Sequence, residues 1–211
     1  MIPVHHPEGD LLLAYAAGGV DAAIALILAT HLTFCPECRG AVALAEQAGG
    51  ILLEDLPPAA LADTALENTL ARLGSPEARK PPIVSHDHTP GPLRAWLGRD
   101  LGRMRWRRMG AQLAYIPFYR RGRVRMRLLR GAPSADVGCH DHRGQEYTLV
   151  LAGGYSDQTG SYGPGDFQTA AQGLKHNPVA DPEGCTNLAV TTAPLRFDGL
   201  MQKFAARLFG F

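Results

Sequence analysis

The run from His140 to Glu146 constrains the fold of this chain more than any other feature of its sequence. In an extended strand alternate side chains share a face, so His140 and His142 point the same way. Glu146 follows a tight turn at Gly144 and can join them from the adjoining strand. A further imidazole, His176, comes thirty positions after the glutamate. Imidazole and carboxylate groups are common metal ligands, so this spacing predicts a metal site inside a β-structure.

The second half of the sequence has the pattern of short strands separated by turns. Arg121–Leu128 alternates charged with other residues at period two, and Tyr147–Leu151 is rich in β-forming residues. Glycine-rich sequences that we interpret as turns are Gly153-Gly154, Gly160 and Gly163-Pro164-Gly165-Asp166. This pattern predicts a small β-barrel or jelly roll over residues 93–198. Leu200, Phe204 and Leu208, spaced four apart, predict a terminal helix over residues 199–211.

This region resembles the two sequence motifs of the cupin family. The first, His-x-His-x3-Glu-x6-Gly, matches at His140, His142, Glu146 and Gly153. The second, Gly-x5-Pro-x-Gly-x2-His, matches at Gly165, Gly173 and His176, with Ala171 in place of the proline. The resemblance implies a cupin barrel with His140, His142, Glu146 and His176 as metal ligands. The spacing alone leaves the metal open among zinc, iron, manganese, nickel and copper.

A second group of metal-binding residue types stands near the start of the chain, where His31 is followed by Cys35 and Cys38. Structural zinc prefers a closed tetrahedral set of nitrogen and sulfur donors. The fourth donor can be His5 or His6, if the preceding segment folds back onto the other three. The alternative is a redox-active pair of thiols. A redox Cys-x-x-Cys usually follows a strand, however, whereas this one lies between predicted helices.

The first eighty residues read as a compact helical unit. Capping and stop signals predict helices over residues 11–17 and 22–30, a third from Pro36 to Gly49-Gly50, and a fourth over about residues 59–73. The proline-rich residues 81–92 predict an extended linker. The predicted fold class is therefore multidomain α + β. A small helical zinc domain (1–80) and the linker (81–92) precede a cupin β-barrel (93–198) and a C-terminal helix (199–211).

The residues near the start of the chain also carry a family resemblance. The motif of the zinc-binding anti-sigma domain is a histidine, twenty-four further residues and then His-x3-Cys-x2-Cys; it matches at His6, His31, Cys35 and Cys38. With the downstream barrel, the whole chain resembles the ChrR family of anti-sigma factors. The resemblance implies a regulator and not an enzyme, with two zinc sites and a sigma factor of RNA polymerase as its partner. It further implies that an oxidative signal such as singlet oxygen, sensed through the cupin domain, releases this extracytoplasmic-function-type sigma factor.

Composition and charge indicate what kind of partner the chain binds and in which compartment it acts. Residues 1–80 carry four basic against ten acidic residues, and residues 81–211 carry seventeen against ten, so the helical part suits a basic, partly apolar partner. Four cysteines without a regular framework, and no secretory signal, favour the cytoplasm. The apolar run Leu11–Leu32 is interrupted by Gly18-Gly19 and Asp21, which argues against a membrane span. We interpret the arginines between Arg94 and Arg130 as solvated strand faces and expect no direct contact with nucleic acid.

Two other classes of protein remain open. A metal-dependent cupin enzyme, such as a dioxygenase or isomerase, would need an open coordination position and a substrate pocket. A DNA-binding regulator would bind duplex DNA by itself, with a strong dependence on salt. For an anti-sigma factor, the sequence does not show how a change in the barrel would reach the helices across the linker.

Overall fold

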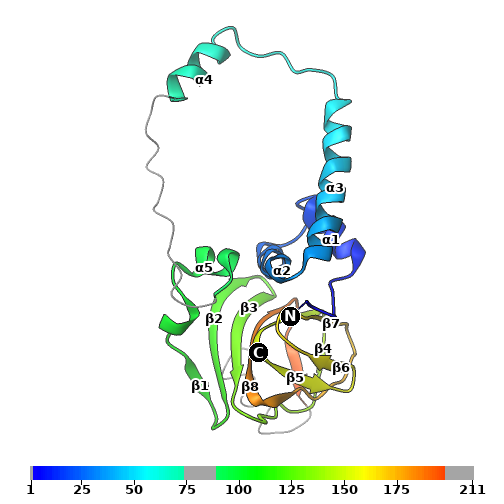
Figure 1. Cartoon of the computed structure of the whole chain (residues 1–211), viewed down its shortest axis with the longest axis vertical. Helices are drawn as coiled ribbons and strands as arrows, with labels where there is room; N and C mark the ends of the chain where they lie inside the picture. The colour runs from blue at the N-terminus through cyan, green and yellow to red at the C-terminus, as the bar shows by residue number, and fades with distance from the viewer. Residues whose placement is uncertain (1, 74–88, 198–211) are drawn as a thin grey trace.

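The structure is a computed structural model that describes residues 2–73 and 89–197 (Figure 1). The expected C-terminal helix over residues 199–211 and most of the expected linker lie outside the described residues. Within the two described ranges, no helix combines the length and the apolar character needed to cross a bilayer.

Four helices form the first part of the chain: α1 (Gly9–Ala16), α2 (Ala22–Phe34), α3 (Pro36–Glu54) and α4 (Ala65–Leu73). Asp21 caps α2, since its carboxylate accepts a hydrogen bond from the backbone N–H of Ala23 at 2.9 Å. Pro36 occupies the first turn of α3, where its missing N–H costs nothing. The existence and order of these helices agree with the sequence prediction.

The predicted end of α3 at Gly49-Gly50 is wrong, because the helix continues to Glu54. A glycine in a helix interior costs only about 1 kcal/mol relative to alanine, so two glycines do not end a helix that is followed by good helix formers. Helix α4 begins at Ala65 and not near residue 59, and residues 57–62, which include Pro57-Pro58, form no helix. The helical part is also less compact than expected: α3 projects from the rest of the molecule and α4 lies far from the barrel (Figure 1).

The second part of the chain is an antiparallel β-barrel of the cupin type, as predicted. A short helix, α5 (Gly91–Leu97), and a 3-10 turn, η1 (Leu101–Arg103), lead into it. The strands are β1 (Arg107–Met109), β2 (Leu113–Arg121), β3 (Val124–Gly131), β4 (His140–His142), β5 (Glu146–Asp157), β6 (Gly160–Tyr162), β7 (Phe167–Ala170), β8 (Val179–Thr191) and β9 (Leu195–Phe197). The larger sheet has the order β1-β2-β3-β8-β5-β6, with β7 also paired to β5, and β4 pairs with β9.

The expected turn at Gly153-Gly154 lies instead inside the long strand β5. Gly153 has a φ of 67°, and the pairing register between β5 and β8 shifts beside it. A side chain at Gly153 would collide with the carbonyl oxygen of Gly184 on β8. Glycine is thus required here by a bulge and a close approach of two strands, not by a chain reversal.

One hydrophobic core joins the helices to the outer face of the barrel. Helix α2 is apolar on nearly every side, which is the pattern of a buried helix. It packs against strands β3, β5 and β8, and α5 packs against α2. The fully buried side chains of this core include Ala23, Ile27 and Leu28 of α2, Leu93 of α5, and Met126, Leu128, Leu149, Leu188 and Val190 of the barrel. Helices and barrel are therefore connected by packing as well as by the chain.

Candidate metal centres

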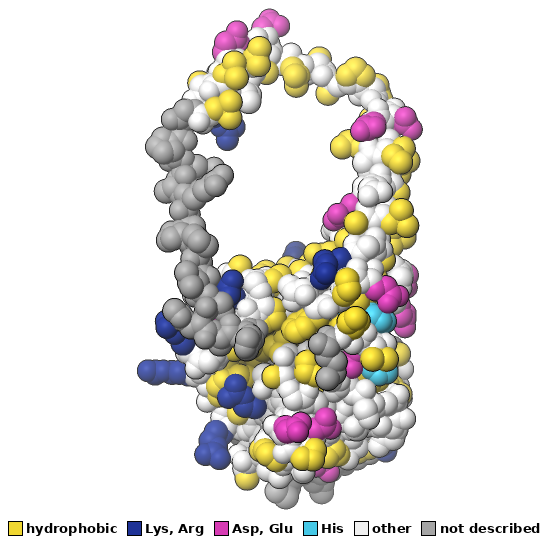
Figure 2. All heavy atoms as spheres, viewed as in Figure 1, with side chains coloured by type: hydrophobic (Ala, Val, Ile, Leu, Met, Phe, Trp, Pro, Cys, Tyr) yellow, Lys and Arg dark blue, Asp and Glu magenta, His cyan; other side chains and the backbone are white. Residues whose placement is uncertain are grey.

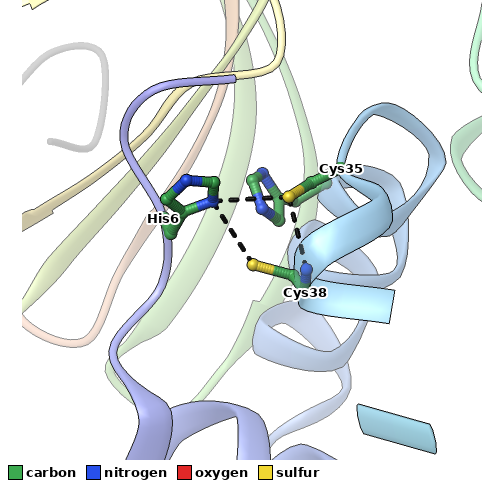
Figure 3. Close-up of side chains that lie close together, drawn as sticks. His6, Cys35 and Cys38 are labelled. Atoms are coloured by element: carbon green, nitrogen blue, oxygen red, sulfur yellow. Dashed lines mark hydrogen bonds between the residues drawn. The ribbon is translucent and has the colours of Figure 1, made fainter. Parts of the chain in front are cut away.

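The first cluster consists of His6, His31, Cys35 and Cys38, whose ligand atoms all lie within 4.8 Å of one another. His31 comes from the last turn of α2, Cys35 precedes α3 and Cys38 stands in its first turn. His6 approaches from the irregular N-terminal segment, with its Nδ1 at 3.3 Å from Cys35 Sγ and 3.5 Å from Cys38 Sγ (Figure 3). The helix junction and the returning segment thus bring together two imidazoles and two thiols, a donor set that suits structural zinc.

The orientation of His31 leaves one ring nitrogen facing the cluster. The ring is fully buried, and its Nδ1 donates a hydrogen bond to the Gly165 carbonyl at 2.8 Å. Nε2 is buried and has no hydrogen-bond partner. Burial lowers the pKa of His31, although the bond to Gly165 opposes this effect, so the ring is held neutral. A neutral imidazole whose second nitrogen is fixed by a carbonyl is the form in which histidine binds a metal.

The Cys38 thiol lacks the lowered pKa of a redox-active cysteine. Burial, together with the neighbouring Cys35, raises the pKa of Cys38 to about 12. A reactive Cys-x-x-Cys needs a lowered thiol pKa instead. The thiol of Cys38 therefore stays protonated until a positive charge arrives beside it, which is what a metal ion would supply.

His5 and His6 point to different places. His5 Nε2 donates to the Ser161 carbonyl at 3.1 Å, and its ring lies 4.5 Å from that of Tyr162. Only His6 reaches the thiols. Of the two residues that the sequence leaves open, His6 is the one that lies beside the thiols.

The second cluster consists of His140 and His142 of β4, Glu146 of β5 and His176, all buried inside the barrel. Nε2 of His176 lies 3.0 Å from Nε2 of both His140 and His142. Glu146 Oε2 lies 3.8 Å from His140 Nε2 and 3.6 Å from His142 Nδ1. Ligands that share one ion at about 2.1 Å in a tetrahedron are about 3.4 Å apart, so this spacing fits a single bound metal.

Inside the barrel, His142 and Glu146 are held in their metal-binding forms. Burial lowers the pKa of His142 to about 4, which keeps this ring neutral. Burial alone would raise the pKa of Glu146, but hydrogen bonding and the charges of the neighbouring histidines outweigh it and lower the pKa. A neutral imidazole and an ionised carboxylate are the states that a divalent ion requires. At His140, by contrast, burial alone would lower the pKa, but the hydrogen bond and the charge of Glu146 outweigh it and raise the pKa.

Two further groups orient the histidines of this cluster, and neither was identified from the sequence. The Gly138 carbonyl accepts from His140 Nδ1 at 2.9 Å, and Asp157 Oδ2 accepts from His176 Nδ1 at 2.7 Å. Burial alone would raise the pKa of Asp157, but hydrogen bonds from Thr159, Gln168 and His176 lower it to about 2. Such partners fix the ring orientation and strengthen a histidine ligand.

Strand β7 contacts the first cluster directly and the second through Asp157. The Phe167 ring centroid lies 5.7 Å from that of His31. The next residue, Gln168, points into the barrel, where its Nε2 donates to Asp157 Oδ2 at 2.8 Å. Because successive side chains of a strand point to opposite faces, one short strand supports both centres.

The other cysteines and the arginines of the barrel are not members of either cluster. Cys139 is partly exposed, whereas Cys185 is buried in a smaller core, and burial raises the pKa of its thiol to about 12. Both are free thiols.

The arginines are not all on solvated faces, because Arg127 is only 4% exposed and burial lowers its pKa to about 10. Arg130 instead stacks on the Trp106 ring at 4.1 Å.

Comparison with known proteins identifies the family. A family of ChrR cupin-like domains matches residues 98–196. The anti-sigma-E factor ChrR of Cereibacter sphaeroides is 39% identical over 207 residues, which is 97% of each chain. A crystal structure of Rhodobacter sphaeroides SigE in complex with the anti-sigma ChrR contains a similar chain, 37% identical, with a TM-score of 0.78 over 89% of this chain and 98% of that one. These relatives are regulators and not enzymes, as the sequence resemblance implied. The likeness extends over helices and barrel alike, and the chain belongs to the ChrR family of anti-sigma factors.

Proposed function

We propose that this protein is a zinc-dependent anti-sigma factor of the cytoplasm. Residues 1–80 would hold an extracytoplasmic-function-type sigma factor away from RNA polymerase. The barrel, residues 93–198, would release it in response to an oxidative signal such as singlet oxygen. The similar chain in the complex with SigE supports the choice of partner.

The observation that carries this proposal is the apolar surface along α3 and α4. Figure 2 shows hydrophobic side chains along both helices. On α4 no side chain is buried, and Leu66, Leu70 and Leu73, spaced by four and three residues, are 55–76% exposed. Large apolar side chains that are exposed on α3 and the segment after it are Leu44, Ile51, Leu52, Leu53, Leu56 and Leu61. Exposed apolar surface of this extent is typical of a protein–protein interface.

The first cluster would fix the direction in which these helices project. His6, His31, Cys35 and Cys38 would bind one zinc ion, and when bound the ion ties together the N-terminal segment, α2 and α3. The free energy of metal binding then becomes free energy of folding at the α2–α3 junction. The apolar surface of α3 would be presented correctly only in the metal-bound state.

The second cluster would serve as the sensor site. His140, His142, Glu146 and His176 offer four protein donors, which leaves no open position on a tetrahedral zinc ion. This favours a regulatory over a catalytic role. A groove at the barrel surface, lined by residues that include Arg108, Arg130, Glu183 and Cys185, contains none of these four ligands.

The partner is tested by coexpression with an extracytoplasmic-function-type sigma factor of the same organism, followed by co-purification. The wild-type chain should retain the sigma factor, and the double variant Cys35→Ser/Cys38→Ser should lose it. Cys139→Ser is the matched control, because Cys139 lies outside both clusters, and it should bind normally. A zinc-loaded wild-type protein that fails to retain the sigma factor would disprove the proposal.

The sensor role is tested separately. His140→Ala/His142→Ala should bind the sigma factor normally but fail to release it after exposure to singlet oxygen. A normal oxidant response in this variant would exclude the barrel as sensor. Metal analysis should give two zinc ions per chain, whereas iron in the barrel together with oxygen uptake would favour a cupin enzyme.

A further inference from the structure

The N-terminal segment, residues 3–6, is fastened to the barrel by a buried carboxylate. Asp166 Oδ1 accepts hydrogen bonds from the backbone N–H groups of Val4 at 2.6 Å and His5 at 2.9 Å. Its other oxygen, Oδ2, accepts from the Gly163 N–H at 2.8 Å. The His5 carbonyl in turn accepts from the Phe167 N–H at 3.0 Å. Asp166 is only 6% exposed, so these bonds form where water competes poorly.

This attachment determines where His6 lies. Residues 2–8 form neither helix nor strand, so no regular hydrogen bonding holds the segment. His6 follows directly after the residue that is bonded through both its N–H and its carbonyl. Its ring makes one other polar contact besides those to the thiols, at 3.7 Å to the exposed Glu37. The bonds of Val4 and His5 to Asp166, together with those of His5 to Phe167 and Ser161, therefore restrain the segment that brings the His6 ring to the cluster.

A second ligand of the same cluster is held by the neighbouring barrel residue. His31 donates to the carbonyl of Gly165, at the turn between β6 and β7. Gly165 has a φ of 90°, and a side chain there would come within 2.8 Å of both Phe34 and Pro3. The turn can thus fit between α2 and the N-terminal segment only because glycine occupies this position. Two consecutive barrel residues thus hold two of the four ligands: Gly165 binds His31, and Asp166 binds the segment that carries His6.

We infer that Asp166 is a positioning residue of the first metal centre, and that the barrel turn Gly163–Asp166 sets the rate at which this centre releases its metal. The centre is then built jointly by helices and barrel. In addition to the shared core, this turn is a point of contact between the two parts that does not depend on the linker. The inference concerns metal retention, so it does not require that a sigma factor or an oxidant acts on the protein.

The test uses the full chain loaded with Co²⁺. Thiolate-to-cobalt charge-transfer absorption reports on the first centre alone, because the barrel cluster contains no cysteine. Excess EDTA is added, and the decay of this absorption gives the release rate. His6→Ala serves as the reference for a centre that has lost one ligand.

Asp166→Ala should release cobalt at least about tenfold faster than wild type, the usual effect of removing a partner that orients a ligand. The release rate of Asp166→Asn should lie between those of wild type and Asp166→Ala. Its single amide oxygen can still accept from Val4 and His5, but not also from Gly163. Val4→Pro removes one donor without changing the barrel, so it keeps the test valid if Asp166→Ala fails to fold. Val4→Pro combined with Asp166→Ala should release no faster than Asp166→Ala alone, since both changes break the same bond.

Asp21→Ala is the matched control. Asp21 also links helices to barrel, through a 3.2 Å hydrogen bond from the Tyr119 hydroxyl, and it caps α2, but it contacts no ligand. Its loss should leave the release rate near the wild-type value. If Asp21→Ala releases cobalt as fast as Asp166→Ala, the effect is general loosening and the inference is wrong. It is equally wrong if His6→Ala accelerates release while the Asp166 variants and Val4→Pro do not.

Discussion

The shared core predicts that a change in α2 destabilises the barrel. Ile27 is fully buried in the hydrophobic core that includes the outer face of the sheet, one turn before His31. Ile27→Ala removes three methyl or methylene groups, worth about 0.8 kcal/mol each in transfer free energy. The remaining cavity raises the total to about 3–4 kcal/mol, within the range measured for such truncations.

The assay is urea unfolding followed by two probes. Far-UV circular dichroism reports mainly on the helices, and fluorescence reports on the chain's two tryptophans, Trp96 on α5 and Trp106 just before β1. Both probes should show one transition, and Ile27→Ala should lower both midpoints by the same amount, about 1–2 M urea. Leu44→Ala on α3, 69% exposed, is the control and should leave both midpoints unchanged. A tryptophan transition that is unmoved by Ile27→Ala would refute the shared core and indicate two independently folding domains.

Three further predictions concern the surface and the metal centres. Leu66→Asp on α4 should weaken sigma-factor binding by at least about thirtyfold without changing stability, because the side chain is 68% exposed; isothermal titration calorimetry and urea unfolding check the two parts. Zinc affinity of the first cluster should rise about tenfold per pH unit between pH 6 and 8 from Cys38 alone, measured by chelator competition. The sign follows from its pKa of about 12: the thiol is protonated without metal and must lose that proton to bind, so a higher pH favours the complex. Asp157→Asn should weaken metal binding in the barrel by about 10- to 100-fold through His176, seen as early loss of one metal equivalent to a chelator, while the thiolate-to-cobalt absorption is retained.

Both metal clusters could be anticipated from the sequence because most of their members are close together in it. Period-two alternation aligns His140 with His142, and a helix start brings Cys35 next to Cys38. The groups that orient the ligands could not be anticipated. Gly165 lies 134 residues from His31. Asp157 belongs to neither motif, and a hydrogen bond between such distant positions leaves no local pattern.

The joining of helices and barrel was missed for a different reason. The proline-rich stretch predicts a linker between two domains, but proline content describes the path of the chain, not the packing of the parts that it connects. A usable signal was present in α2, which lacks a polar face. A helix of this kind must be covered on more than one side, and α1 and α3 cannot do this alone. The predicted helix end at Gly49-Gly50 and the predicted turn at Gly153-Gly154 are wrong, because glycine pairs mark helix ends and turns only on average.

Strand β7 makes a contact on each of its two faces: Phe167 packs against His31, and Gln168 donates a hydrogen bond to Asp157. A strand can slide only in whole residues, and a slip of one residue exchanges its faces. Deleting one residue from the turn before β7 would set an amide against the buried imidazole and force a phenyl ring toward the carboxylate. Substitutions along this strand can be graded in their effect, whereas a single insertion or deletion there would disable both metal centres in one step.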